Sequence, residues 1–378
     1  MGFLSLLFLA YTSAARQPQT THIQFELQMP SHLRQLESVF ISGDHPSLGS
    51  WDPSKIKMRP SGKGLWTYVA EVPAGIPIQF KFTLGDWRRI EVTNQNKNIP
   101  NRQVRCSQDC IFSIQAENFR LDPFHPQPRT TQGNIEYYHE VYSAEFDNRR
   151  SIAIYLPPGY SSSSTRYPVI YAMDGQNLFD EATSVHGQEW KLDEAMENLF
   201  RSHKIQPAIV VAIYSTTKRN EEYLMNPKFG NFIARQIKAE IDRRYRTHAG
   251  PESTFLLGSS FGGVFAFYAA WTAPSVFSRF AALSTAYWWN NGAIERMIKS
   301  SPSQKKPMRI WMDMGDKEPG EFSTGPAQLE RAYQTLLSVQ QPKESIHKVV
   351  IPGGTHDEIS WSLRIYPALQ FLLGNIKK

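Results

Sequence analysis

The stretch Gly-Ser-Ser-Phe-Gly at residues 258–262 decides the fold of the larger part of this chain. It follows an apolar run at 253–257 and leads into Gly-Val-Phe-Ala-Phe-Tyr-Ala-Ala at 263–270, which is typical of a buried helix. A strand, a G-x-S-x-G turn and a helix in this order strain the backbone of the central serine and lift its hydroxyl above the sheet edge. The pattern predicts Ser260 as a nucleophile; the alternative is a helix N-cap.

Two segments of the C-terminal third supply the partners that a serine nucleophile requires. Its hydroxyl is weakly nucleophilic at neutral pH, so it needs a histidine base and an orienting carboxylate, in the chain order Ser, acid, His. An apolar strand expected at 308–314 ends in a carboxylate-rich turn, 315–318, and a strand expected at 346–351 runs into a glycine-rich loop containing His356. Because reacting groups collect at the carboxyl edge of open α/β sheets, His356 is the predicted base.

Strands and helices alternate from residue 135 onward, which predicts a mostly parallel sheet with helices on both faces. Three further segments carry a resemblance: D-G-Q-N-L-F-D at 174–180, G-Q-E-W at 187–190 and R-N-E-E-Y at 219–223. With the G-x-S-x-G turn, they make residues 135–371 similar to the esterase family of α/β-hydrolases that includes feruloyl esterases, enterochelin esterases and S-formylglutathione hydrolases. The resemblance implies an α/β-hydrolase fold and hydrolysis of carboxylic esters.

The resemblance also implies a set of catalytic residues. It makes Ser260 the nucleophile, His356 the base and Glu318 the acid, three residues after the glycine of the turn. The family more often has aspartate at that position, so Asp313 and Asp316 remain alternatives for the acid. In this interpretation Ser260 attacks an ester carbonyl, and water hydrolyses the acyl-enzyme with His356 again as base.

The developing oxyanion needs preorganised donors, each worth about 3 kcal/mol of the barrier. One is expected to be the backbone N–H of Phe261, the residue after the nucleophile. The second is expected from the loop after the strand that ends near Met173, at Gln176 or Gly175.

Three tryptophans are candidate walls of an acyl or sugar pocket. They are Trp190, in the G-Q-E-W segment, and the adjacent Trp288 and Trp289, after a strand expected at 280–283. Aromatic residues at helix starts and strand ends equally serve as core, so core packing is the alternative for each of them.

The first third of the chain has a different pattern. Short alternating runs from 22 to 115, separated by Gly, Pro and Asn, predict a small all-β sandwich of the immunoglobulin-like type. L-G-S-W-D-P at 48–53 and F-K-F at 80–82 make it similar to the starch-binding domain family. The resemblance implies that Trp51 stacks on a sugar ring, with Trp87 in a shifted second position. The alternative is a scaffold that orients or shields the catalytic domain.

These patterns divide the chain into four parts. Residues 1–15 resemble a secretory signal peptide, although no basic n-region precedes the apolar run. Residues 20–117 form the predicted sandwich, the proline-containing segment 118–134 reads as a stiff linker, and 135–378 form the catalytic domain.

The two cysteines agree with export. Cys106 and Cys110 do not form a C-x-x-C motif, so a local disulfide in an oxidising compartment is expected; a reduced pair is the alternative. The predicted location is secreted or periplasmic.

Composition and motifs exclude several other classes. The net charge is +6 and the pI about 9.1, yet the basic residues are scattered and no nucleic-acid motif accompanies them. No metal constellation, P-loop or dinucleotide fingerprint is present, so neither metal nor cofactor is expected, and no segment is long enough to span a bilayer. The oligomeric state stays open.

The sequence therefore predicts a serine esterase that acts on an acylated carbohydrate or related polyol, with a possible polysaccharide partner for the N-terminal module. A siderophore esterase of the enterochelin type fits the same residues. The third interpretation is a carbohydrate-binding protein whose hydrolase domain has lost activity.

Overall fold

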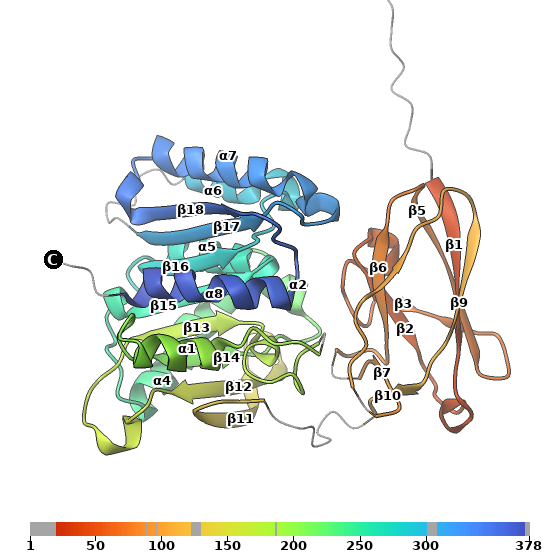
Figure 1. The fold of residues 1–378 in the computed structure, drawn as a ribbon, viewed down its shortest axis with the longest axis horizontal. Helices are drawn as coiled ribbons and strands as arrows, with labels where there is room; N and C mark the ends of the chain where they lie inside the picture. Colours follow the sequence, from red (N-terminus) through yellow and green to blue (C-terminus); the bar gives the residue numbers. More distant parts are fainter. Residues whose placement is uncertain are drawn as a thin grey trace, which may run out of the picture.

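A computed structural model describes residues 20–374, apart from 88, 96, 122–129, 186 and 301–307. The predicted signal peptide and residues 122–129 of the predicted linker lie outside the described residues. The described chain forms two domains, a β-sandwich and an α/β domain, which lie side by side (Figure 1).

The N-terminal domain is a sandwich of two four-stranded sheets, with orders β4-β5-β1-β9 and β3-β2-β6-β8. Every second residue of β1 points inward: Ile23, Phe25 and Leu27 are buried, and their neighbours are more exposed. Phe25 packs edge-to-face on Phe80 of the other sheet, with ring centroids 4.8 Å apart. The strands are β1 (Thr20–Gln28), β2 (Phe40–Gly43), β3 (Ile56–Lys57), β4 (Arg59–Pro60), β5 (Leu65–Pro73), β6 (Ile78–Thr83), β8 (Arg102–Val104) and β9 (Cys110–Gln115). The immunoglobulin-like type of this sandwich stays a prediction.

The sandwich extends beyond its predicted boundary at residue 117. β10 (Asn118–Phe119) pairs antiparallel with β7 (Glu91–Val92), although these residues were expected to begin the linker. The reason is Phe119, which is 2% exposed and packs into the sandwich core. One buried aromatic side chain thus orders a segment that lacks any periodicity in the sequence.

The second domain is built on an eight-stranded sheet of order β11-β12-β14-β13-β15-β16-β17-β18. β11, β12 and β14 pair antiparallel, and all pairs from β14 to β18 are parallel, as predicted. The strands are β11 (Asn134–Ser143), β12 (Asn148–Leu156), β13 (Val169–Met173), β14 (Ile209–Ile213), β15 (Thr254–Ser259), β16 (Arg279–Leu283), β17 (Arg309–Gly315) and β18 (Ile346–Ile351).

Helices cover both faces of this sheet, so its strands are apolar on both sides. Residues of α1 and α8 share one buried cluster with alternate residues of β13, and residues of α4 to α7 share a second cluster with the others. The helices are α1 (Leu192–Arg201), α2 (Arg219–Tyr223), α3 (Pro227–Asn231), a π-helical segment (Phe232–Ile237), α4 (Lys238–Arg244), α5 (Phe261–Thr272), α6 (Ala293–Ser300), α7 (Gly325–Ser338) and α8 (Glu358–Leu373). Within the described ranges, none of these helices combines the length and the apolar content of a membrane span.

The sandwich faces the carboxyl edge of the parallel strands. In Figure 1 the arrowhead of β13 points toward the sandwich, and α2 lies at the same side. Asn220 of α2 donates to the backbone carbonyl of Ser50 at 3.2 Å, and Asn98 of the sandwich donates to the carbonyl of Ser184. The N-terminal module therefore borders the edge at which the predicted catalytic residues lie.

Candidate active site

Ser260 occupies a sharp turn between β15 and α5. Its φ of 54° and ψ of −120° fall in a region that side chains rarely adopt. The turn is possible because its glycines allow close approach: a Cβ at Gly258 would lie 2.4 Å from the carbonyl oxygen of Gly262, and one at Gly263 would lie 2.5 Å from Thr285 Oγ1. The G-x-S-x-G segment thus adopts the strand, turn and helix that the sequence predicts.

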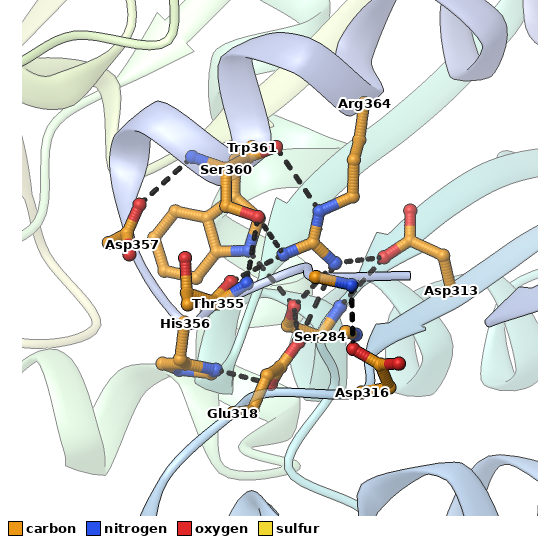
Figure 2. Close-up of polar contacts among 12 residues, drawn as sticks. Ser284, Asp313, Asp316, Glu318, Thr355, His356, Asp357, Ser360, Trp361 and Arg364 are labelled. Carbon is orange, nitrogen blue, oxygen red and sulfur yellow. Dashed lines mark hydrogen bonds and ion pairs between the residues drawn. The ribbon is translucent and has the colours of Figure 1, made fainter. Parts of the chain in front are cut away.

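His356 lies in the loop between β18 and α8, with its imidazole held on three sides. Its Nδ1 donates to Glu318 Oε2 at 2.8 Å (Figure 2). The ring stacks on Phe322 at 3.8 Å between centroids and meets Trp361 edge-on at 5.0 Å. This arrangement fixes the ring and leaves Nε2 as the nitrogen that can exchange a proton with a substrate or nucleophile.

Glu318 is buried beneath His356 and its other oxygen is fully engaged. Oε1 accepts from Ser284 Oγ at 2.5 Å and from the N–H of Gly315 at 2.6 Å, and Arg364 Nη1 lies 3.5 Å away (Figure 2). Burial alone would raise the pKa of Glu318, but the hydrogen bonds from His356, Ser284 and Gly315 outweigh it and hold the pKa below its usual value. Glu318 is therefore an anion at neutral pH that can stabilise an imidazolium.

The two alternative acids do not contact His356. Asp313 is buried and accepts from Arg364 Nη1 at 2.9 Å and from Trp311 Nε1 at 2.8 Å. Asp316 accepts from the N–H of Gly353 at 2.7 Å, which joins the turn after β17 to the loop after β18. Asp313 thus fixes Arg364, and Asp316 fixes the loop that carries His356.

Ser260 and His356 lie at the same edge of the sheet, at the ends of β15 and β18. Their side chains form no hydrogen bond in the structure; catalytic hydrogen bonds in ligand-free sites are frequently long. A chain of aromatic contacts connects them, from Phe261 to Trp288 at 6.1 Å, on to Phe322 at 5.7 Å and from there to His356.

The residues expected to supply the oxyanion donors follow β13 and β15 in the structure. Gly175 and Gln176 form a 3-10 turn directly after β13, and Phe261 begins α5. None of the described residues accepts a hydrogen bond from the backbone N–H of these three residues. Gly175 has no space for a side chain, because a Cβ there would lie 2.5 Å from the backbone of Ala212. These N–H groups are free to bind an anion.

A largely buried ion pair clamps the loop after β13 that carries the expected oxyanion donors. Asp174 has a φ of 56°, and both of its oxygens accept from Arg219, at 2.7 and 2.8 Å. The N–H of Asp174 donates to the hydroxyl of Tyr223 at 3.0 Å. Gln176 is fixed separately, since its amide donates to Ser215 Oγ and accepts from Ser215 N–H. The bidentate pair sets the direction of the backbone that follows.

Replacing Arg219 by methionine is expected to lower kcat about 10- to 100-fold with a smaller change in KM, because the loop loses its clamp and its N–H groups shift away from the oxyanion. The measurement is steady-state hydrolysis of p-nitrophenyl acetate. Arg243→Met, which removes an exposed arginine of α4, should leave kcat unchanged. Equal rates for both variants would remove the clamp from the mechanism.

The predicted tryptophans have different environments. Trp190 is 1% exposed and packs on Trp361, with ring centroids 5.4 Å apart. It therefore has no surface to offer a substrate, and it forms part of the core instead of a pocket wall. Trp288 is partly buried against Phe261 and Phe322, and Trp289 is also partly buried beside it. These two remain candidates for the pocket wall.

In the sandwich, the structure brings Trp51 and Trp87 together. Their ring centroids lie 6.2 Å apart at an angle of 45°, and both side chains are partly exposed. Cys106 and Cys110 are joined by a disulfide, as expected.

Sequence reasoning missed several residues that position the site. Ser284, directly after β16, has a φ of 43°, and its hydroxyl donates to Glu318 while accepting from Trp361 and Arg364. Arg364 lies on α8 and no local pattern marks it. Arg219 did carry a signal, since it begins the R-N-E-E-Y segment, but no role was derived for it.

Comparison with protein families identifies both domains. Residues 143–372 match the family model described as "Putative esterase", and residues 20–115 match the model described as "Starch binding domain". The first match spans more than half of the chain and confirms the resemblance.

Individual relatives are distant. "Uncharacterized protein YbbA" of Bacillus subtilis is 24% identical over 247 residues, which cover 60% of this chain and 93% of YbbA. An "Iron(III) enterobactin esterase" of Escherichia coli is 26% identical over 176 residues, which cover 44% of this chain and only 42% of that protein. "Ferri-bacillibactin esterase BesA" of Bacillus subtilis is 23% identical over 232 residues, or 53% of this chain and 77% of BesA.

A solved structure resembles both domains at once. The enterobactin esterase FES from Shigella flexneri superimposes with a TM-score of 0.55 at 17% identity, covering 95% of this chain and 94% of that chain. This likeness concerns the fold. With the family match over residues 143–372, we conclude that the chain belongs to the "Putative esterase" family and is a carboxylic ester hydrolase with a starch-binding-type domain at its N-terminus.

Proposed function

We propose that this protein is a serine esterase in which Ser260 is the nucleophile, His356 the general base and Glu318 the acid. The observation that carries the proposal is the Nδ1–Oε2 hydrogen bond of 2.8 Å between His356 and Glu318 at the sheet edge where the strained Ser260 also lies. Nδ1–H donation fixes the tautomer whose Nε2 accepts a proton.

The reaction proceeds in two halves. Ser260 Oγ attacks the ester carbonyl, its proton passes to His356 Nε2, and the carbonyl oxygen takes up negative charge against the N–H groups of Phe261 and of Gln176 or Gly175. His356 returns the proton to the leaving alcohol. Water then attacks the acyl-enzyme by the same route, and Ser260 is regenerated.

We propose an acylated carbohydrate or related polyol as the substrate, held on the catalytic edge by the N-terminal module. Trp51 and Trp87 form an aromatic pair that suits the faces of sugar rings. Trp51 directly follows Ser50, whose carbonyl contacts Asn220 beside the oxyanion clamp. A chain bound to this pair would therefore pass close to the ester site.

A second electrostatic link joins the module to the site. Burial lowers the pKa of Lys81, in the sandwich, to about 8, while the nearby carboxylate of Glu358 opposes this shift. Glu358 lies two residues after His356 and accepts from Asn177 of the oxyanion loop at 3.1 Å. Burial also raises the pKa of Glu358 to about 8, so this link strengthens as the pH rises and Glu358 ionises. The module thus acts electrostatically on a residue beside both catalytic loops, which favours a substrate that reaches both domains.

A siderophore ester is the second candidate substrate. It is favoured by the names of the relatives, which include enterobactin and bacillibactin esterases, and by the two-domain likeness to FES. Both candidates use the same catalytic residues and differ in what the module contacts. The third interpretation is an inactive carbohydrate-binding protein. The effect of replacing Ser260 on esterase activity tests it directly.

The experiment that separates the substrates compares wild type with Trp51→Ala on three esters: p-nitrophenyl acetate, acetylated maltodextrin and a tris-catecholate trilactone. We expect that Trp51→Ala is no longer retarded in starch gels and that its kcat/KM for the maltodextrin ester falls about tenfold. Its kcat/KM for p-nitrophenyl acetate should be unchanged. Ile111→Ala, an exposed apolar side chain of β9 that is 64% exposed, is the matched control. Hydrolysis of the trilactone at least about 100-fold faster than the maltodextrin ester would select the siderophore.

We further propose that the protein works outside the cytosol. The disulfide between Cys106 and Cys110 supports this placement, because such bonds persist in oxidising compartments. The signal peptide expected at residues 1–15 lies outside the described part of the chain.

A further inference from the structure

A group of carboxylates at the start of α1 has no part in the chemistry above. Glu189 precedes the helix, and Asp193 and Glu194 lie in its first turn. One side-chain oxygen of each residue lies within 4.8 Å of the others. Two anions this close repel each other strongly unless a cation or protons lie between them.

Several oxygens of this group are buried and lack a hydrogen-bond donor among the described residues. Asp193 is 0% exposed and Glu189 is 2% exposed. Each has one oxygen bound by the segment before β11: Gln132 N–H donates to Asp193 at 2.6 Å, and Thr130 Oγ1 donates to Glu189 at 2.5 Å. The remaining oxygens, Glu189 Oε2, Asp193 Oδ1 and Glu194 Oε2, are buried and have no donor group among the described residues; the carboxyl groups of Asp193 and Glu194 interact with each other. Unpaired buried carboxylate oxygens are costly, and a bound cation would remove that cost.

The surroundings add negative charge. Asp180 and Glu181 lie close enough to act on Glu189 electrostatically, and across the described ranges no lysine or arginine forms an ion pair with Glu189, Asp193 or Glu194. This local excess of carboxyl groups favours a bound cation.

We propose that Glu189, Asp193 and Glu194 bind a hard divalent cation, Ca²⁺, at the junction between the interdomain segment and α1. Three carboxylates supply only oxygen ligands, which Ca²⁺ prefers, and its flexible coordination tolerates ligands completed by water. A cation held by Asp193 and Glu189 adjoins Gln132 and Thr130, whose backbone N–H and hydroxyl bond to oxygens of the same two carboxylates. It therefore fastens the segment that leads into β11 to the first turn of α1.

The test uses Tb³⁺ as a luminescent probe for Ca²⁺ on the full chain after treatment with EDTA. Trp190 adjoins Glu189 in sequence and can sensitise bound Tb³⁺. We expect saturable luminescence at a stoichiometry near one, displacement by Ca²⁺, and a rise in Tm of about 5 °C at saturating Ca²⁺. Absence of a saturable signal in the wild type would overturn the proposal.

Two variants make the assignment specific. Asp193→Asn, which keeps an oxygen for Gln132 N–H, and Glu194→Gln should each weaken Ca²⁺ binding at least about tenfold. Without Ca²⁺, Asp193→Asn should melt at or above the wild-type temperature, because it removes a repelling charge, and this separates lost binding from misfolding.

Glu344→Gln, which replaces an exposed carboxylate elsewhere, is the control and should bind Ca²⁺ as the wild type does. Unchanged affinity in Asp193→Asn and Glu194→Gln would refute the site. Esterase activity is not the readout, so the proposal stands or fails independently of the catalytic assignment.

Discussion

Ser260→Ala is expected to lower kcat for p-nitrophenyl acetate at least about 10⁴-fold, because the only nucleophile in the proposed mechanism is removed while the oxyanion donors remain. Labelling by a fluorophosphonate probe should disappear in the same variant, since the probe reports an activated serine. Alanine at 260 keeps the turn and its left-handed strain, so the fold should persist; circular dichroism and Tm check this.

Ser259→Ala is the matched control for that experiment. Ser259 is the neighbouring residue, ends β15 and is 4% exposed. Its replacement should leave both labelling and kcat near the wild-type values. Labelling that survives in Ser260→Ala would exclude Ser260 as the nucleophile. A wild type that neither reacts with the probe nor hydrolyses esters would favour the inactive carbohydrate-binding protein.

Glu318→Gln is expected to lower kcat at least about 100-fold with folding intact. The amide can still accept from Ser284 and from the N–H of Gly315 through its oxygen, but its NH₂ group then faces His356 Nδ1. This selects the tautomer that carries its proton on Nε2, where the base must accept one, and it removes the charge that stabilises the imidazolium. The measurement is kcat from pH 5 to 9.

The dependence of kcat on pH should show no loss of the Glu318 charge above about pH 5. Because the pKa of Glu318 is held below its usual value, the acid stays ionised as the pH falls, and its stabilising contribution is lost only below about pH 4.5, its ordinary pKa. The titration of Glu318 should therefore not appear in the wild-type profile between pH 5 and 9.

The rival carboxylates are the controls. Asp316→Asn should keep kcat within about twofold, because the amide oxygen of asparagine can still accept from the N–H of Gly353 and hold the loop that carries His356. Asp313→Asn should lower Tm, since it leaves the buried Arg364 with a weaker partner. A wild-type rate in Glu318→Gln, with a large loss in Asp316→Asn, would transfer the role of the acid.

What the sequence could predict was local. The G-x-S-x-G turn, the two strand ends and the alternation of strands with helices each follow from neighbouring residues. The structure has them as expected, except that β17 ends at 315 and not at the predicted 314. The position of Glu318 against His356 depends on the adjacent pairing of β17 and β18. Because parallel neighbours end at one edge, even this contact could be anticipated from element order.

What the sequence could not predict depends on contacts between distant segments. Arg364 meets Asp313 across 51 positions, and no spacing rule connects a residue of α8 with β17. Trp190 shares its sequence context with pocket residues, yet its partner Trp361 places it in the core. The carboxylates at α1 could not be predicted as a site, because acidic residues such as Asp193 and Glu194 are common in the first turn of a helix, where they interact favourably with its dipole.

Because the backbone of Ser260 has a positive φ, thermostability and catalytic turnover favour different residues at this position. A glycine at this position would adopt φ of 54° without steric cost, whereas serine keeps the penalty in every folded molecule. Laboratory selection for heat resistance alone would then reward variants that have discarded the nucleophile. Any programme that evolves this enzyme for industrial use must screen for catalysis in every round, because the most durable descendants will include inert ones.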